Sequence, residues 1–130
     1  KKLQIEARII GDMCLNHVIP AAVRYQNILI ENVKGMKDIF GDDYLNYCAS
    51  EIETLKKIST YINNVSADVE GLVEARKKAN RIEAIAERAK VYSYEVKDMM
   101  EKVRVSADNL EMLIDDEVWP LPKYRELLFF

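Results

Sequence analysis

Glycine and proline are scarce in this sequence, with four Gly and three Pro among 130 residues. Because these two residues interrupt helices most strongly, their scarcity leaves room for very long helices. Histidine occurs once and cysteine twice, without a Cys-x-x-Cys pair, which argues against a metal site. The sequence has no Gly-rich phosphate loop, no Gly-x-Ser-x-Gly and no His-Glu-x-x-His. We therefore assign no catalytic, cofactor-binding or metal-binding residue.

No apolar run reaches the roughly 18 residues that a transmembrane helix needs, so we expect no membrane association. The net charge of −3 gives no basic excess for phosphate contacts, which argues against nucleic acid as a partner. The 49% of apolar residues are enough for the core of one domain, which we place at residues 1–130.

Apolar residues recur at steps of three and four along nearly the whole chain, which is typical of helices. A first helix is predicted at residues 3–40, with a kink or break near residues 17–19 because Pro20 removes a backbone donor. Gly41 should end this helix, and Asp42 or Asp43 should cap the next one.

A second helix is predicted at residues 44–79 and a third at residues 81–116, with Asn80 and Glu83 forming the N-cap pattern of the third. Short connections between long helices make neighbours antiparallel. Pro122 can begin a short last helix. The predicted fold is all-α: an antiparallel bundle of three long helices, the first kinked at Pro20, with a short C-terminal helix.

Cys14 and Cys48 lie on the apolar stripes, so we expect two reduced, buried thiols and a cytoplasmic location. A disulfide would require the two helices to align at that level. His17 lies on the same apolar stripe as Cys14, and a buried, hydrogen-bonded core histidine is the favoured interpretation over a general base.

The most basic stretch, residues 74–81, includes Arg76 and Lys77. We interpret it as a solvated helix end whose cations complement the helix dipole, with a docking surface for an acidic partner as the alternative. The triplet 115–117 is acidic, and a salt bridge to Lys123 or Arg125 is more plausible there than metal binding. The tail after it is rich in aromatic and apolar side chains, including Trp119 and Tyr124, and should fold back on the bundle or dock elsewhere.

Three segments resemble the type III glutamine synthetases, in the order expected for that family. They are residues 16–27, 73–80 and 115–129, which read NHVIPAAVRYQN, VEARKKAN and DDEVWPLPKYRELLF. The tail motif is long and unusual in composition, so a chance similarity is improbable. The missing initiator Met and the helical pattern that begins at Leu3 also favour a piece of a longer protein.

The resemblance implies a parent enzyme that makes glutamine from glutamate, ammonia and ATP with Mg²⁺ or Mn²⁺, in large multisubunit rings. No position here matches the family's nucleotide, metal or glutamate ligands, so this chain would be a non-catalytic C-terminal helical domain with a structural, assembly or regulatory role. It implies the catalytic domain of the same chain and neighbouring subunits as partners, with His17, Pro20, Arg76, Lys77, Trp119, Tyr124 and Arg125 as candidate docking or structural residues.

Two other functions stay open at this point. One is an independent helical-bundle interaction module, which a stop codon just before Lys1 in the source gene would favour. The other is a small helical enzyme that uses His17, for which substitution of His17 would have to abolish a measurable turnover without unfolding the protein.

Overall fold

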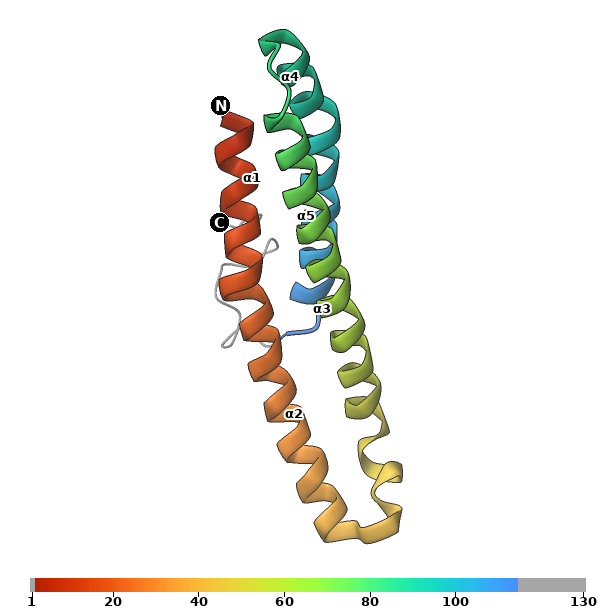
Figure 1. Cartoon of the computed structure of the whole chain (residues 1–130). Helices are drawn as coiled ribbons and strands as arrows, with labels where there is room; N and C mark the ends of the chain where they lie inside the picture. Colours follow the sequence, from red (N-terminus) through yellow and green to blue (C-terminus); the bar gives the residue numbers. More distant parts are fainter. Residues whose placement is uncertain (1, 115–130) are drawn as a thin grey trace, which may run out of the picture.

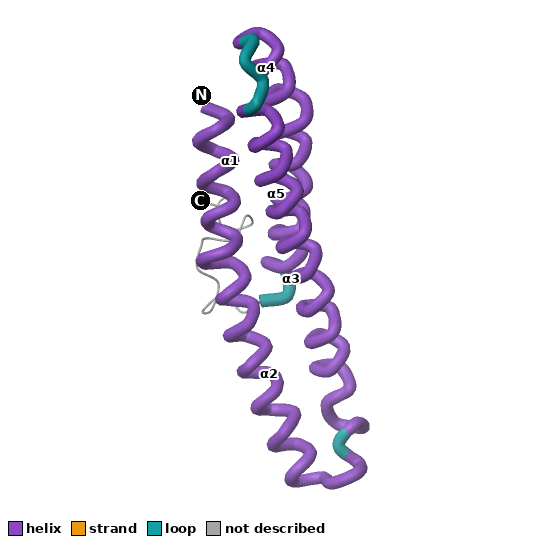
Figure 2. The backbone as a smooth tube through the Cα atoms, viewed as in Figure 1, coloured by secondary structure: helices purple, strands orange, loops and turns teal. Residues whose placement is uncertain are grey.

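The computed structural model describes residues 2–114, and these are helical nearly throughout (Figures 1 and 2). No strand occurs within this range, so the all-α prediction is confirmed. The predicted last helix at Pro122 lies outside the described residues. The α-helices are α1 (Lys2–Met13), α2 (Ile19–Phe40), α3 (Leu45–Asn80), α4 (Ile85–Val91) and α5 (Lys97–Glu111).

Three lines of helix lie side by side along half of the molecule (Figure 1). The first line is α1 and α2, the second is α3, which runs back along it, and the third is α4 and α5, which returns along α3. The third line ends part-way down. The last part of α2 and the first part of α3, on either side of the turn at residues 41–44, continue beyond it as a pair, which we call the two-helix arm (Figure 2).

The core fills the part of the molecule where all three lines meet. Small residues on the first line, such as Ala7, Gly11 and Ala22, let its backbone approach α3 closely, and a Cβ added at Gly11 would lie 3.8 Å from Cγ1 of Val69. Burial of a Leu or Ile side chain in such a core contributes about 1.5–3 kcal/mol. The largest fully buried side chains are Ile58, Leu72, Leu110, Val65, Val96 and Val103.

Two π-helical segments, Cys14–Val18 and Tyr92–Val96, interrupt the α-helical lines. The first lies where Pro20 predicts a kink or break, but the torsion angles of Val18 and Ile19 remain helical, so the helix is not broken there. The backbone N–H of Ile19 donates to the carbonyl of Cys14, five residues back. Pro20 is the second residue of α2. The π-helical turn before Pro20 is wider than an α-helical turn. The backbone carbonyls of this turn are therefore arranged differently around the proline ring than they would be in an α-helix.

The turn after α2 confirms one predicted helix end and corrects another. Gly41 ends α2 with a φ of 61°, which favours glycine, and its N–H donates to the carbonyl of Lys37. Neither predicted aspartate caps α3, because residues 41–43 form a 3₁₀ turn and Tyr44 directly precedes the helix without a side-chain cap. Asp43 instead accepts a hydrogen bond from the side-chain amide of Asn46.

The predicted start of the third helix is wrong. Asn80 is the last residue of α3, and α4 begins at Ile85 after the extended residue Ala84, so Asn80 and Glu83 do not cap it. The Oδ1 of Asn80 accepts a hydrogen bond from the hydroxyl of buried Tyr92 at 2.6 Å. The guanidinium of Arg88 donates to the carbonyl of Ile82 at 2.8 Å. Side chains of the returning helical line, rather than a local cap, therefore stabilise this turn.

Candidate functional site

The described residues hold no cluster of three His, Cys, Asp or Glu side chains that could bind a metal ion. Within residues 2–114, no helix is long and apolar enough to cross a membrane.

His17 is exposed, so the prediction of a buried core histidine is wrong. It lies in the π-helical segment Cys14–Val18, whose first and last residues are both buried. The buried stripe continues from Val18 to Ala22 on the core side of the helix. A π-helical segment has more residues per turn than an α-helix, so residues spaced at three and four no longer lie on one face of the helix there. His17 therefore falls outside the buried face.

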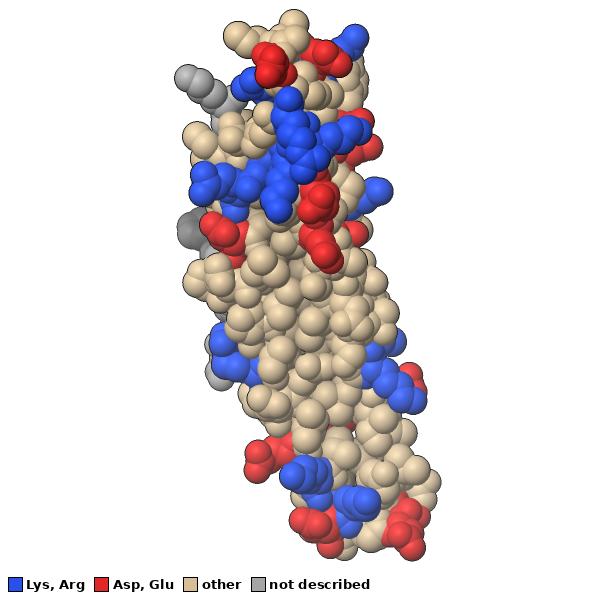
Figure 3. Space-filling model, in the orientation of Figure 1, with Lys and Arg blue, Asp and Glu red and all other residues tan. Residues whose placement is uncertain are grey.

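The basic stretch at the end of α3 lies on the surface, as the solvated-end interpretation predicts. Lys77 is exposed and Arg76 is half-buried. Nζ of Lys78 lies 3.2 Å from the Glu95 carboxylate, and both side chains are well exposed, so this ion pair adds little stability. Figure 3 shows Lys and Arg side chains gathered at this end of the molecule with Asp and Glu side chains among them. This mixed charge gives no uniformly basic surface.

Three of the candidate residues, Trp119, Tyr124 and Arg125, lie outside the described residues, as does the acidic triplet 115–117. The structure therefore leaves their predicted docking roles as predictions.

Both cysteines are buried and carry free thiols, as predicted. Burial raises the pKa of the Cys14 thiol from 9.0 to about 11. Burial also raises the pKa of Cys48, and the neighbouring Glu51 carboxylate adds to this effect. The Cys48 thiol donates to the carbonyl of Tyr44 at 3.2 Å, at a point where non-helical torsion angles bend α3. The thiolate is the reactive form, so these are structural rather than nucleophilic cysteines.

The raised pKa of Cys14 predicts a loss of stability in alkali. In the unfolded chain this thiol ionises near pH 9, whereas in the folded chain it stays protonated until about pH 11. Stability is therefore fully present below pH 9 and falls as the pH rises toward 11. We expect the urea midpoint of the wild type to fall more steeply over this range than that of Cys14→Ala. If the urea midpoints of the two proteins fell in parallel as the pH rises, the raised pKa of Cys14 would be contradicted.

An uncharged belt crosses the middle of the face shown in Figure 3, between the charged ends of the molecule. On the first helical line, the exposed apolar side chains of the charge-poor residues 13–30 include Leu15, Val23 and Ile30, which are 49%, 42% and 42% exposed, and we assign these three to the belt. On α3 the segment 58–67 contains no Lys, Arg, Asp or Glu. Ile58 and Val65 of this segment are buried in the core, and we assign its exposed residues, such as Asn63 and Asn64, to the belt. The side-chain amide of Gln26 donates to the Ser59 hydroxyl at 2.8 Å and joins the two helices across the belt.

The belt is not among the sites predicted from the sequence, because those predictions follow the apolar stripes that become buried in the core. The signal was available in the charge pattern: residues 13–30 contain one charged side chain, Arg24, although 32% of the chain is charged. Depletion of charge together with exposed apolar side chains is characteristic of the centres of protein interfaces. The belt is therefore the strongest candidate site among the described residues.

Comparison with known proteins points to one family. Residues 1–37 match the family model of the glutamine synthetase C-terminal domain. A glutamine synthetase of Bacteroides fragilis is 47% identical over 129 residues, which is 98% of this chain. The chain belongs to the glutamine synthetase family. The resemblance found in the sequence is thereby confirmed.

Two further relatives are more distant. A protein of Dictyostelium discoideum named type-3 glutamine synthetase is 27% identical over 99% of this chain, and a glutamine synthetase of Butyrivibrio fibrisolvens is also 27% identical over 99%. The chain spans only 18% of the length of each of these three relatives. The family model places it with the C-terminal domain of a glutamine synthetase.

Proposed function

We propose that this chain is a non-catalytic structural and assembly domain at the C-terminus of a type III glutamine synthetase. The single observation that carries the proposal is the uncharged belt, an exposed surface with the composition of an interface centre on a chain whose relatives are several times longer. The partners would be the catalytic region of the same polypeptide and neighbouring subunits of a homo-oligomer in the cytoplasm. ATP, Mg²⁺ or Mn²⁺ and glutamate would bind outside this chain, in the rest of the enzyme.

The belt suits a permanent contact within a larger protein. Apart from His17 and Arg24, the exposed side chains of residues 13–30 and 58–67 are apolar or are neutral amides and hydroxyls, such as Asn63 and Asn64, and these can be buried without the desolvation penalty of a charge. The exposed apolar residues would gain about 25 cal/mol for each Å² removed from water. An interaction module that acts alone would not need to share its chain with an enzyme. The extent of the match to glutamine synthetases therefore favours the assembly role.

The test is a charge placed in the belt of the full-length protein. The double variant Val23→Glu and Ile30→Glu should lose subunit assembly in sedimentation experiments, because each carboxylate would be buried unpaired in the contact. Glutamine formation should fall by at least about tenfold, which corresponds to roughly 1.4 kcal/mol.

The matched control is Val105→Glu with Ile85→Glu, which changes exposed side chains outside the belt. It should retain both assembly and activity. Equal behaviour of the two double variants would refute the role of the belt. Glutamine formation by the 130-residue chain alone would refute its non-catalytic character.

A further inference from the structure

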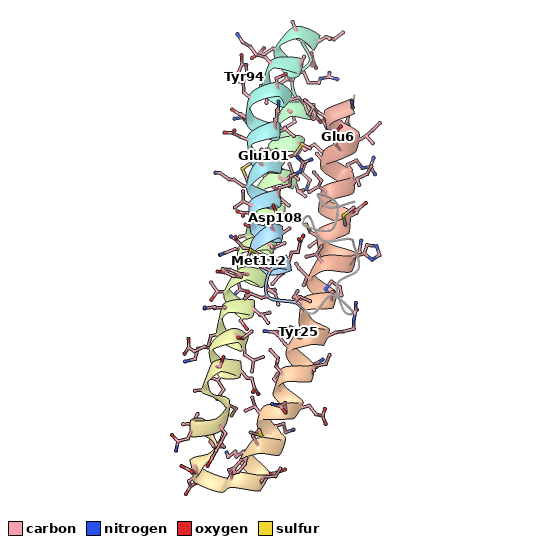
Figure 4. The ribbon with its side chains drawn as sticks, turned by 180° about the vertical axis from the view of Figure 1, so that it is seen from behind. Glu6, Tyr25, Tyr94, Glu101, Asp108 and Met112 are labelled. Carbon is pink, nitrogen blue, oxygen red and sulfur yellow. The ribbon has the colours of Figure 1, made fainter. Side chains whose placement is uncertain are left out.

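A shallow groove runs along α2 in the two-helix arm, on a stripe that starts at Tyr25. Its residues recur at steps of three and four, so they share one face of the helix. In Figure 4, Tyr25 lies just beyond the level at which α5 ends near Met112. The groove has a volume of about 560 Å³ and is lined by Asn27, Ile28, Glu31, Asn32, Gly35, Met36 and Ile39.

The arm lacks the third layer that covers the rest of the molecule. On α3, Ile58 and Val65 are fully buried where the third line is present, whereas Ile52 and Leu55 in the arm are only half-buried. On α2, Val33 and Met36 are half-buried in the same way. The apolar stripes that build the core thus continue into the arm, but no element among residues 2–114 covers them there.

Gly35 makes the centre of the groove hollow. A Cβ added at this position would meet nothing within 4 Å. The neighbouring apolar side chains of the stripe, Ile28 and Ile39, are 54% and 74% exposed. A hollow of this kind between two aliphatic side chains can accept a large apolar or aromatic side chain.

The chain itself supplies a suitable occupant at this point. Ile114, the last described residue, is only 2% exposed and packs in the core. Because α5 ends near the level of Tyr25 in Figure 4, the described chain ends close to the level at which the groove starts. Sixteen residues follow, and they could span up to about 53 Å if extended, whereas the stripe from Tyr25 to Ile39 is about 21 Å long. Half of these sixteen residues are large and apolar: Val118, Trp119, Leu121, Tyr124, Leu127, Leu128, Phe129 and Phe130.

We propose that residues 115–130 bind along this groove of the same chain and complete the third layer over the two-helix arm, with a large side chain over Gly35. The proposal stands apart from the assembly role of the belt, because the groove and the belt involve different stripes of α2. We infer that the occupant is this chain's own tail rather than a second copy, because the described residues end at Ile114, close to the level of the groove, and the sixteen residues that follow are enough to span it.

Fluorescence of Trp119, the one tryptophan of the chain, tests the proposal in the 130-residue protein. In the wild type, Trp119 should be shielded from a soluble quencher such as iodide. Glu31 also lines the groove, but it is exposed. Gly35→Glu instead fills the central hollow itself, and a large apolar side chain over this position could not cover the new carboxylate without desolvating it. In this variant the Trp119 emission should move to longer wavelength, and the quenching constant should rise severalfold.

Gly35→Glu should fold, because the new side chain meets open space and Glu favours a helix more than Gly does. Gly35→Ala is the matched control. It also replaces the glycine in the helix but fills little of the hollow, so Trp119 should stay shielded, and circular dichroism should show the same helix content in all three proteins. A tail deletion after Ile114 should speed hydrogen exchange in residues 28–39.

Three results would overturn the proposal. One is a Trp119 side chain that is as quenchable in the wild type as in urea. Another is unchanged exchange in residues 28–39 after the deletion. The third is shielding that disappears on dilution together with a dimer in sedimentation, because the occupant would then come from a second copy.

Discussion

Val96→Asp is expected to prevent stable folding of this domain at neutral pH. Val96 is fully buried in the π-helical segment Tyr92–Val96, where the third helical line packs against the first and second. An aspartate there would place an unpaired carboxylate among apolar side chains of the core. Such substitutions cost more than about 4 kcal/mol, a large fraction of the 5–15 kcal/mol that stabilises an ordinary domain. Urea denaturation followed by circular dichroism would measure the loss.

Val105→Asp provides the matched control, since Val105 is 58% exposed on α5 and the chemical change is the same. It should cost less than about 0.5 kcal/mol. The two variants should also differ in acid. Burial raises the pKa of an aspartate above its unfolded value, so protonation favours the folded state and the deficit of Val96→Asp relative to wild type should shrink as the pH falls. A deficit that is independent of pH would contradict the burial of this position.

The sequence predicts the helical class and several helix ends well, because these depend on local chemistry. Scarce Gly and Pro and sustained steps of three and four predict long helices, and the structure has them. The end of α2 at Phe40 follows from Gly41, the single residue with positive φ among those described. The burial of Cys14 and Cys48 follows from their positions on apolar stripes.

The errors arise where tertiary contacts override a local pattern. The pattern from Asn80 to Glu83 resembles a helix cap, but the Asn80 side chain accepts a hydrogen bond from Tyr92 and the helix starts later. Ile85 fits the apolar stripe of the third helix yet is exposed, because it lies at the end of the molecule beyond the first helical line (Figure 1). A periodic pattern identifies one face of a helix but does not show where along the helix its partners end.

The candidate surfaces could be predicted only in part for a related reason. The belt has a sequence signal, the near absence of charge in residues 13–30 and 58–67, although it differs from the motifs that identify enzymes. The groove at Gly35 has none, because it exists only where α5 stops short of the arm, and that depends on the relative lengths of three packed helices. The apolar tail suggests that a docking surface exists, but its sequence does not locate that surface.

Leu72→Ala should be strongly destabilising. Leu72 is 1% exposed on α3 and belongs to the same core cluster as Val69, Val96 and Met100. Truncation of a buried leucine removes its transfer free energy and leaves a cavity that rigid neighbouring helices cannot fill, so the cost is about 2–5 kcal/mol. For a domain of this size the melting temperature should fall by roughly 3–5 °C for each kcal/mol.

The matched change is Leu45→Ala on the same helix, where Leu45 is 51% exposed at the start of α3 in the two-helix arm. Half of its surface is already in contact with water, and its neighbours can relax around the shorter side chain, so the cost should stay below about 1 kcal/mol. The comparison holds residue type and helix constant, and its main variable is burial under the third line. The third helical line covers α3 at Leu72 but not at Leu45, and this is the main difference between the two ends of the helix. Equal losses of unfolding free energy at the two positions, in thermal or urea unfolding, would therefore show that the third line does not build the core at Leu72.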